Sequence, residues 1–174
     1  MSVLRSLDER LLRLARTRCH APRIERAVSG FSSVGEHGGV WLAIGVAGHG
    51  ADPARRPCWR RALRAVALAY AFNTALKLAS GRRRPQLAGL PPLTGTPTGL
   101  GFPSAHASTS FAGALAYSRL GLPRAGVYAL AVGLAASRVY LGVHYPSDLL
   151  GGAALGAAVA RAFGPSSGGS ARTS

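Results

Sequence analysis

Five apolar segments rich in glycine and alanine follow one another along this 174-residue chain. They cover roughly residues 36–50, 61–80, 105–120, 123–141 and 147–163. A helix that crosses a bilayer needs about 20 apolar residues, and small residues allow such helices to pack closely. The pattern therefore predicts an all-α, membrane-embedded helical bundle with about five spanning helices. A soluble helical bundle with an alanine-rich core is the alternative.

The charge of the chain is strongly unbalanced, with 21 Lys and Arg residues against 6 Asp and Glu residues and a formal net charge of +15. Such an excess is typical of proteins that bind nucleic acid or an anionic membrane. Apolar segments separate the basic clusters, and the sequence contains no nucleic-acid-binding motif. We therefore expect a multi-pass protein of the cell membrane that contacts membrane lipids and binds no nucleic acid. Arginines fall on both sides of the predicted bundle, so they leave both orientations open.

The first residues have a different pattern, in which apolar side chains recur at steps of three and four residues with arginines between them. The apolar positions are Val3, Leu4, Leu7, Leu11 and Leu14. This periodicity predicts an amphipathic helix in the membrane interface, ended by Ala21-Pro22. Packing of the same helix on a protein core is the alternative. We expect this helix and a linker over 1–30, a membrane domain over 31–163, and a disordered Gly/Ser-rich tail over 164–174.

Polar residues lie at the ends of the apolar segments, and a Pro/Gly-rich loop follows the second segment. In an antiparallel bundle, the ends of the second and fourth segments and the starts of the third and fifth lie on one side. The topology therefore gathers seven residues on one membrane face: Lys77, Arg84, Ser104, His106, Arg138, His144 and Asp148. Ionisable residues at such a position are costly and indicate a functional site.

The cations of this set are suited to a phosphate dianion, which arginine can hold through two hydrogen bonds. Ser104 begins a predicted helix, whose free N–H groups would add to an anion site. Taken singly, these residues also have structural interpretations. Lys77 is also typical of a helix-end lysine, Arg84 of a topology signal, and Ser104 of a helix cap.

Two histidines allow one nucleophile or base and one acid. Asp148 follows His144 by about one helical turn, so it could hold one imidazole nitrogen and leave the other free to attack. The structural interpretation of His106 and His144 is that of hydrogen-bonded core residues, and Asp148 could simply cap a helix. The convergence of all seven residues on one face favours the functional interpretation.

Their spacing resembles the signature of the type 2 phosphatidic acid phosphatase superfamily, which reads K-x6-R-P, P-S-G-H and S-R-x5-H-x3-D. The corresponding stretches here are Lys77-x6-Arg84-Pro85, Pro103-Ser104-Ala105-His106 and Ser137-Arg138-x5-His144-x3-Asp148. Ala105 replaces the common glycine, and its methyl group slightly narrows the phosphate pocket. Arg82 and Arg83 lie outside the signature and are interpreted as headgroup or surface contacts.

The resemblance implies a membrane phosphatase that needs neither a metal nor a cofactor and forms a phosphohistidine intermediate. His144 would attack phosphorus, oriented by Asp148, and His106 would protonate the leaving alkoxide. The residues expected to hold the phosphate oxygens are Lys77, Arg84, Ser104 and Arg138.

The implied substrate is an amphiphilic phosphorylated lipid, since members of this family act on phosphatidic acid, phosphatidylglycerol phosphate and polyprenyl diphosphates. The short chain, Gly35-Glu36-His37 and the stretch 142–146 also resemble compact actinobacterial members. One group of these removes the 5-phosphate from decaprenylphosphoryl phosphoribose, a precursor of cell-wall arabinan, and this remains an alternative. Alternatives of other classes are a vanadium-dependent haloperoxidase and a non-catalytic basic membrane protein.

Overall fold

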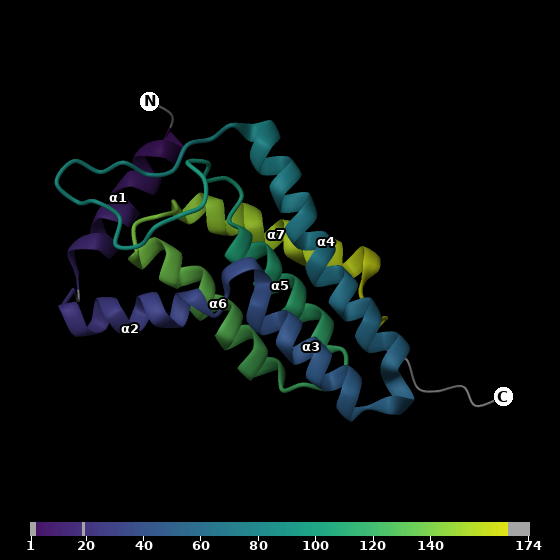
Figure 1. The fold of residues 1–174 in the computed structure, drawn as a ribbon. Helices are drawn as coiled ribbons and strands as arrows, with labels where there is room; N and C mark the ends of the chain where they lie inside the picture. The colour runs from purple at the N-terminus through teal and green to yellow at the C-terminus, as the bar shows by residue number, and fades with distance from the viewer. Residues whose placement is uncertain (1–2, 19, 167–174) are drawn as a thin grey trace.

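The computed structural model describes residues 3–18 and 20–166, which form seven α-helices and two short 3-10 helices (Figure 1). The α-helices are α1 (Val3–Thr17), α2 (Pro22–Ser33), α3 (Gly39–Ala51), α4 (Arg56–Ser80), α5 (Ala105–Ser118), α6 (Arg124–Tyr140) and α7 (Pro146–Phe163). The 3-10 helices are η1 (Glu36–Gly38) and η2 (Pro53–Arg55). The prediction of an all-α fold is therefore confirmed. Most of the expected C-terminal tail, 167–174, lies outside the described residues.

Each of the five apolar segments forms one helix, from α3 to α7. The N-terminal amphipathic pattern forms α1, but α2 was not predicted. Pro22 ends the preceding stretch and also occupies the first turn of α2, where a proline is tolerated because no intrahelical N–H bond is lost. Among the helices of the described residues, none combines the length and the apolar content required of a membrane span.

Helix α5 lies at the centre of the bundle, in contact with α3, α4, α6 and α7. Most of its residues are buried, including polar ones such as Ser108 and Thr109. The contact between α5 and α7 depends on glycine, because a Cβ atom at Gly152 or Gly156 would collide with the α5 backbone carbonyls. Small residues thus let these two helices approach closely, as the sequence pattern indicated.

A cluster of aromatic side chains fixes the half of the bundle that lies away from the loop 81–104. Trp41, Trp59 and Tyr117 are buried in one hydrophobic core, and the Trp41 indole donates a hydrogen bond to Ser110 Oγ at 2.9 Å. The Tyr117 hydroxyl donates to the Trp41 carbonyl at 2.7 Å. These contacts join α3, α4 and α5, because buried aromatic residues with satisfied polar atoms hold neighbouring helices in register.

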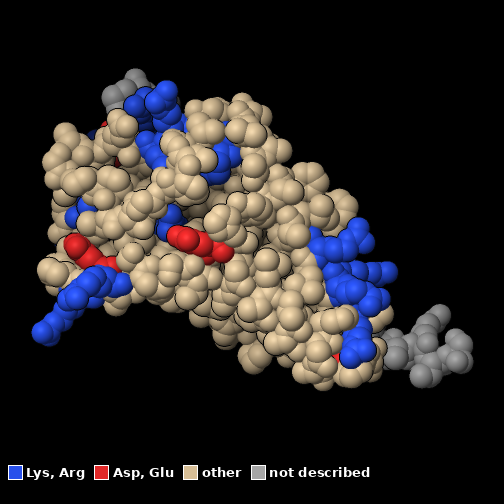
Figure 2. All heavy atoms as spheres, viewed as in Figure 1, with Lys and Arg blue, Asp and Glu red and all other residues tan. Residues whose placement is uncertain are grey.

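The predicted site residues lie at the opposite end of the bundle. The C-terminal ends of α4 and α6 and the N-terminal ends of α5 and α7 lie there, beside α1 and the loop 81–104 (Figure 1). Basic side chains are concentrated at the end of the molecule away from the loop 81–104, where α3 joins α4 (Figure 2). This concentration includes the exposed residues Arg55, Arg56, Arg60, Arg61 and Arg64.

Helix α1 packs on the bundle in an unusual orientation. It buries Asp8, Leu12 and Arg16, whereas its row of leucines is exposed. Leu7 is 51% exposed and Leu11 is 42% exposed, while Leu12 is fully buried. The apolar face of α1 therefore does not pack on the core of this chain, which rules out that alternative for the described residues.

Candidate functional site

A cavity of about 320 Å³ lies between the C-terminal ends of α4 and α6, the N-terminal end of α5 and the loop before α7. Five of the seven predicted site residues line it: Lys77, Arg84, His106, Arg138 and His144. The other two, Ser104 and Asp148, are buried, and the Ser104 N–H donates a hydrogen bond of 3.0 Å to the Asp148 carbonyl. The structure thus brings all seven residues together, although they come from four helices and two loops.

His144 occupies the short loop between α6 and α7, directly before the helix that carries Asp148. Pro146 stands in the first turn of α7, and Asp148 Oδ2 accepts a hydrogen bond of 2.9 Å from the Tyr145 N–H. The same oxygen lies 3.4 Å from His144 Nδ1. Asp148 therefore caps the helix and faces the imidazole at once, so the two interpretations of this residue are compatible.

The second imidazole nitrogen of His144 faces a cation. Arg84 Nη1 lies 2.9 Å from His144 Nε2, and since a guanidinium can only donate, Nε2 is the acceptor. The proton of the neutral ring is then on Nδ1, toward Asp148. Burial lowers the pKa of His144 to about 4, so the imidazole is neutral at neutral pH with its lone pair on Nε2. This is the protonation state that a nucleophile requires.

Buried polar atoms in and beside the cavity lack a partner among the described residues. Ser104 Oγ and Arg138 Nε are buried and make no hydrogen bond to any described residue. Ser104 stands at the N-cap of α5, but its side chain does not cap the helix. Buried polar groups are normally hydrogen-bonded, so these two atoms indicate a site for an acceptor such as a phosphate oxygen.

Lys77 is held at the base of the cavity by backbone carbonyls. Its Nζ donates hydrogen bonds to the carbonyls of Leu100, at 3.3 Å, and Pro103, at 3.1 Å. Asn73, one turn earlier on α4, donates to the same Pro103 carbonyl at 3.0 Å. These bonds fix the loop that precedes Ser104 against α4 and place the ammonium beside Arg84 and Arg138.

Ser32, at the end of the unpredicted helix α2, is a site residue that sequence reasoning missed. Its hydroxyl oxygen accepts hydrogen bonds from Arg138 Nη1, at 2.9 Å, and Ser137 Oγ, at 3.0 Å. Its carbonyl lies 3.0 Å from His106 Nε2. Ser32 therefore orients one cation and one histidine of the site. A lone serine outside any motif offers no sequence signal for this function.

Asp8 and Arg82 form a second supporting group, between α1 and the start of α7. Arg82 Nη2 donates to Asp8 Oδ2 at 2.8 Å, and Arg82 Nη1 lies 3.3 Å from Asp148 Oδ1. The Arg82 guanidinium also lies over the ring of Tyr145, 5.1 Å from its centre. Arg82 thus bridges two buried carboxylates while its side chain stays 31% exposed, so these contacts are compatible with its interpretation as a headgroup or surface contact. The long arginine side chain reaches inward from the loop, which sequence position alone does not indicate.

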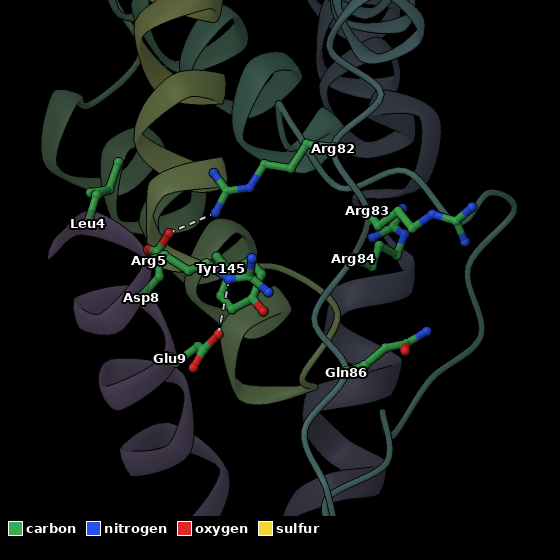
Figure 3. Close-up of a pocket in the computed structure, with 9 residues that line it drawn as sticks. All are labelled: Leu4, Arg5, Asp8, Glu9, Arg82, Arg83, Arg84, Gln86 and Tyr145. Atoms are coloured by element: carbon green, nitrogen blue, oxygen red, sulfur yellow. Dashed lines mark hydrogen bonds and ion pairs between the residues drawn. The ribbon is translucent and has the colours of Figure 1, made fainter. Parts of the chain in front are cut away.

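A larger cavity of about 610 Å³ separates α1 from the loop residues 82–86 (Figure 3). Figure 3 shows Asp8 and Arg82 directed toward each other across it, whereas Arg83 is directed away from α1. Arg84 lines both this cavity and the cavity of about 320 Å³, so it forms part of the wall between them. Arg83 is exposed, in agreement with its expected place on the surface.

Residues 59–166 match the sequence profile of the PAP2 superfamily. The chain is 40% identical over 139 residues to a decaprenylphosphoryl-5-phosphoribose phosphatase of Mycobacterium tuberculosis, over 79% of this chain and 77% of that protein. It is 37% identical over 132 residues to a protein of the same name from Mycolicibacterium smegmatis, over 75% and 72% of the two chains.

Two solved structures share the fold. One is a transmembrane PAP2-type phosphatidylglycerolphosphate phosphatase from Bacillus subtilis, with a TM-score of 0.79 and 25% identity over 94% of this chain and 85% of that chain. The other is LpxE from Aquifex aeolicus, with a TM-score of 0.77 and 22% identity over 94% and 98% of the two chains. At that identity, the second likeness concerns the fold alone.

Proposed function

This chain belongs to the PAP2 superfamily and is a lipid phosphatase of that type, and on this premise we propose that it is an integral-membrane enzyme that removes the 5-phosphate from a polyprenylphosphoryl phosphoribose. The observation that carries the chemistry is the His144 imidazole, neutral and held between Asp148 and Arg84 at the edge of a cationic cavity. The names of the mycobacterial relatives support the substrate. The wider form of this proposal is hydrolysis of other lipid phosphates and diphosphates.

The proposed reaction proceeds in two displacements at phosphorus. In the first, the lone pair of His144 Nε2 forms a bond to phosphorus, the bond to the leaving alkoxide breaks, and His106 protonates that oxygen. In the second, water attacks the phosphohistidine, His106 accepts a proton from the water, and the phosphorus–nitrogen bond breaks to release phosphate. Asp148 stabilises the positive charge of the phosphorylated ring through Nδ1–H.

The role of His106 follows from its hydrogen bond. Because His106 Nε2 donates to the Ser32 carbonyl, a neutral ring carries its lone pair on Nδ1. The ring therefore donates to the leaving group in its doubly protonated form, which a bound phosphate dianion stabilises. After that transfer, the same Nδ1 is free to accept the proton of the attacking water.

The remaining site residues stabilise charge rather than exchange protons. Lys77, Arg84 and Arg138 line the cavity, and Ser104 Oγ and Arg138 Nε are two buried donors without a partner among the described residues. Fixed donors of this kind act on the charge that develops on the phosphoryl oxygens in the transition state. No step draws on a metal ion or a cofactor.

Several observations support a position in the membrane with α1 at the interface. The likeness to a transmembrane phosphatase covers nearly the whole chain, and the leucine row of α1 is exposed. The exposed Leu7 and Leu11 lie on the same helix as Asp8, which is bound beside the site. An interfacial α1 would therefore place the cavity at the depth of a lipid phosphate. The relatives at 37–40% identity are named phosphatases, which favours hydrolysis over the haloperoxidase alternative.

Phosphate release from detergent-purified protein in the presence of EDTA tests this function. The substrates are a polyprenylphosphoryl phosphoribose, phosphatidic acid, phosphatidylglycerol phosphate and undecaprenyl diphosphate, each with a His144→Ala control. We expect release that requires His144, persists in EDTA, and is fastest with the phosphoribose lipid. Faster release from another lipid would reassign the substrate, and release that stops in EDTA would overturn the mechanism.

A further inference from the structure

The basic surface at the end of the molecule away from the loop 81–104 takes no part in the proposed reaction. Arg56, Arg60 and Arg64 recur there at steps of four residues, so they lie along one face of α4. Two further exposed arginines flank this row (Figure 2). We call the whole set the arginine patch: Arg55, Arg56, Arg60, Arg61 and Arg64.

Only the first members of the arginine patch have partners within the described chain. Arg55 pairs with Asp52 at 2.6 Å and donates a hydrogen bond of 3.2 Å to the Leu120 carbonyl. Arg56 Nε donates to the His49 carbonyl at 3.4 Å. The other three arginines make no hydrogen bond or ion pair with any described residue. Their charged groups therefore remain available to a partner outside the chain.

The acidic residues of the chain do not balance these charges. The sequence contains six, and all except Asp52 belong to α1, α2, η1 and the first turn of α7. Asp52 already accepts hydrogen bonds from Arg55 and, at 3.1 Å, from the Trp59 indole. Like charges on neighbouring turns of a helix repel one another. An anion supplied from outside the chain would relieve this repulsion.

The exposed surface of α4 changes from charged to apolar directly after Arg64. From residue 67 to residue 79, its exposed side chains are those of alanine, leucine and phenylalanine, with Thr74 as the exception. The Thr74 hydroxyl donates back to the Tyr70 carbonyl at 3.0 Å. Lys77, the one charged residue of this stretch, is buried and lines the cavity of about 320 Å³. The exposed face of α4 thus joins a cationic part to an apolar part.

The length of the apolar part indicates what surrounds it. At 1.5 Å per residue, the stretch of α4 from Arg64 to Ser80 is about 24 Å long. The hydrocarbon core of a bilayer is about 30 Å thick, and long arginine side chains extend from its edge toward the headgroups. A phospholipid offers a phosphate next to hydrocarbon, which matches both parts of this face. Nucleic acid would match the arginines alone.

We infer that the arginine patch binds the headgroups of anionic phospholipids in the leaflet opposite the candidate site. This inference rests on the membrane position that belongs to the proposed function, and not on the phosphatase chemistry. The guanidinium groups of Arg60, Arg61 and Arg64 donate hydrogen bonds to the lipid phosphates. The apolar face that follows contacts the acyl chains of the same lipids. The patch thereby holds α4, with Lys77 near its other end, at a fixed depth in the membrane.

Photo-crosslinking of the full chain in phosphatidylcholine liposomes tests this surface. Two trace probes, phosphatidylglycerol and phosphatidylcholine, carry the same photoreactive group in the acyl chain beside the glycerol, and mass spectrometry identifies the labelled peptides. Each basic residue near an anionic surface contributes about a fivefold factor in binding. For three free arginines, we expect the phosphatidylglycerol probe to label the segment 55–71 on the order of 100-fold more strongly than the choline probe. Salt at about 1 M is expected to weaken this preference.

Two triple variants separate charge from structure. The first combines Arg60→Gln, Arg61→Gln and Arg64→Gln, and it is expected to abolish the preference for phosphatidylglycerol. The second replaces the same three residues by lysine and is expected to keep most of the preference. Both are expected to release phosphate from a micellar substrate at the wild-type rate, because the patch lies at the other end of the bundle. Equal labelling of the wild-type protein by the two probes would overturn the inference, as would a preference that the glutamine variant retains.

The remaining outcomes distinguish this inference from its alternatives. Tighter binding of a labelled RNA than of phosphatidylglycerol liposomes, lost in the glutamine variant, would assign the arginine patch to nucleic acid and overturn the inference. If the wild-type protein selects phosphatidylglycerol at 55–71 but releases no phosphate from any lipid, the proposed catalytic function is wrong and the lipid surface stands. If it releases phosphate in a His144-dependent manner without that selection, only the assignment of the arginine patch is wrong.

Discussion

Asp8 in α1 and Ser147 in the first turn of α7 are 139 residues apart in sequence, yet the Asp8 carboxylate accepts two hydrogen bonds from Ser147. The Ser147 N–H donates at 3.0 Å and its hydroxyl at 2.5 Å. Burial by itself raises the pKa of Asp8, but the bonds from Ser147 and Arg82 outweigh it, so this pKa lies below its usual range. The ionised Asp8 thus ties α1 to the turn that carries Asp148.

Asp8→Asn is expected to lower kcat about tenfold and the free energy of unfolding by about 1–3 kcal/mol. The variant removes the charge that pairs with Arg82 and leaves buried donors poorly satisfied. Steady-state kinetics and chemical unfolding in detergent measure the two effects. The control is Asp52→Asn, which disturbs a similar pair with Arg55 at the far end of the bundle. The same kcat loss in the control would contradict a specific role for Asp8.

Arg82→Gln and Arg83→Gln are a matched pair of neighbouring substitutions. Arg82 bridges Asp8 and Asp148, while Arg83 is exposed, so we expect about a tenfold loss of kcat in the first variant and a normal rate in the second. KM is expected to change little, because Arg82 acts on the orientation of Asp148 rather than on the phosphate. An equal rise of KM in both variants would instead indicate that the two arginines attract the anionic lipid.

Asp148→Asn is expected to lower kcat by about 100- to 10,000-fold with a smaller change in KM. The asparagine amide no longer stabilises the charged ring and favours the wrong tautomer of His144. His144→Ala is expected to abolish turnover. Rapid-quench trapping of a phosphorylated protein checks the order of events. A phosphohistidine that still accumulates in His144→Ala would assign the nucleophile to another residue.

The pH dependence of kcat/KM follows from the buried environment of His144. Because its pKa is lowered to about 4, the ring stays neutral, and able to attack, until the pH falls through about 4. An ordinary histidine would lose activity near pH 6.5. The phosphate monoester itself titrates near pH 6, so rates are compared per dianion. If the kcat/KM per dianion instead falls as the pH drops through about 6.5, His144 is solvated in the active enzyme.

Substitutions on the buried face of α1 are expected to lower stability, whereas those on its exposed face are expected to lower activity at a membrane. Leu12→Ala removes a fully buried side chain and is expected to cost about 2–5 kcal/mol of stability. Leu7→Gln and Leu11→Gln change exposed side chains, so stability in detergent stays normal. We expect the latter pair to lower activity on substrate in liposomes but not in mixed micelles. Equal activity in both media would argue against an interfacial α1.

The convergence of most of the proposed catalytic set was predictable because it depends on spacing and topology. The positions of Lys77, Arg138 and His144 relative to the helix ends are readable from the apolar periodicity, and an antiparallel bundle has few ways to arrange them. The supporting residues were not predictable. Ser32 bonds to Arg138 from a helix that was not expected, and Asp8 is one acidic residue in an arginine-rich stretch.

The amino-acid sequence by itself determined six of the seven α-helices of the described residues, the family, and the end of the bundle at which the seven signature residues meet. These properties follow from local periodicity and chain direction, which adjacent residues encode. Only the tertiary structure decided which face of α1 is buried, because amphipathic spacing defines two faces but not their partners. It also decided that Arg82 turns inward and that Glu36 borders the cavity, since hydrogen bonds and charge pairs between distant segments depend on distances that no local pattern contains.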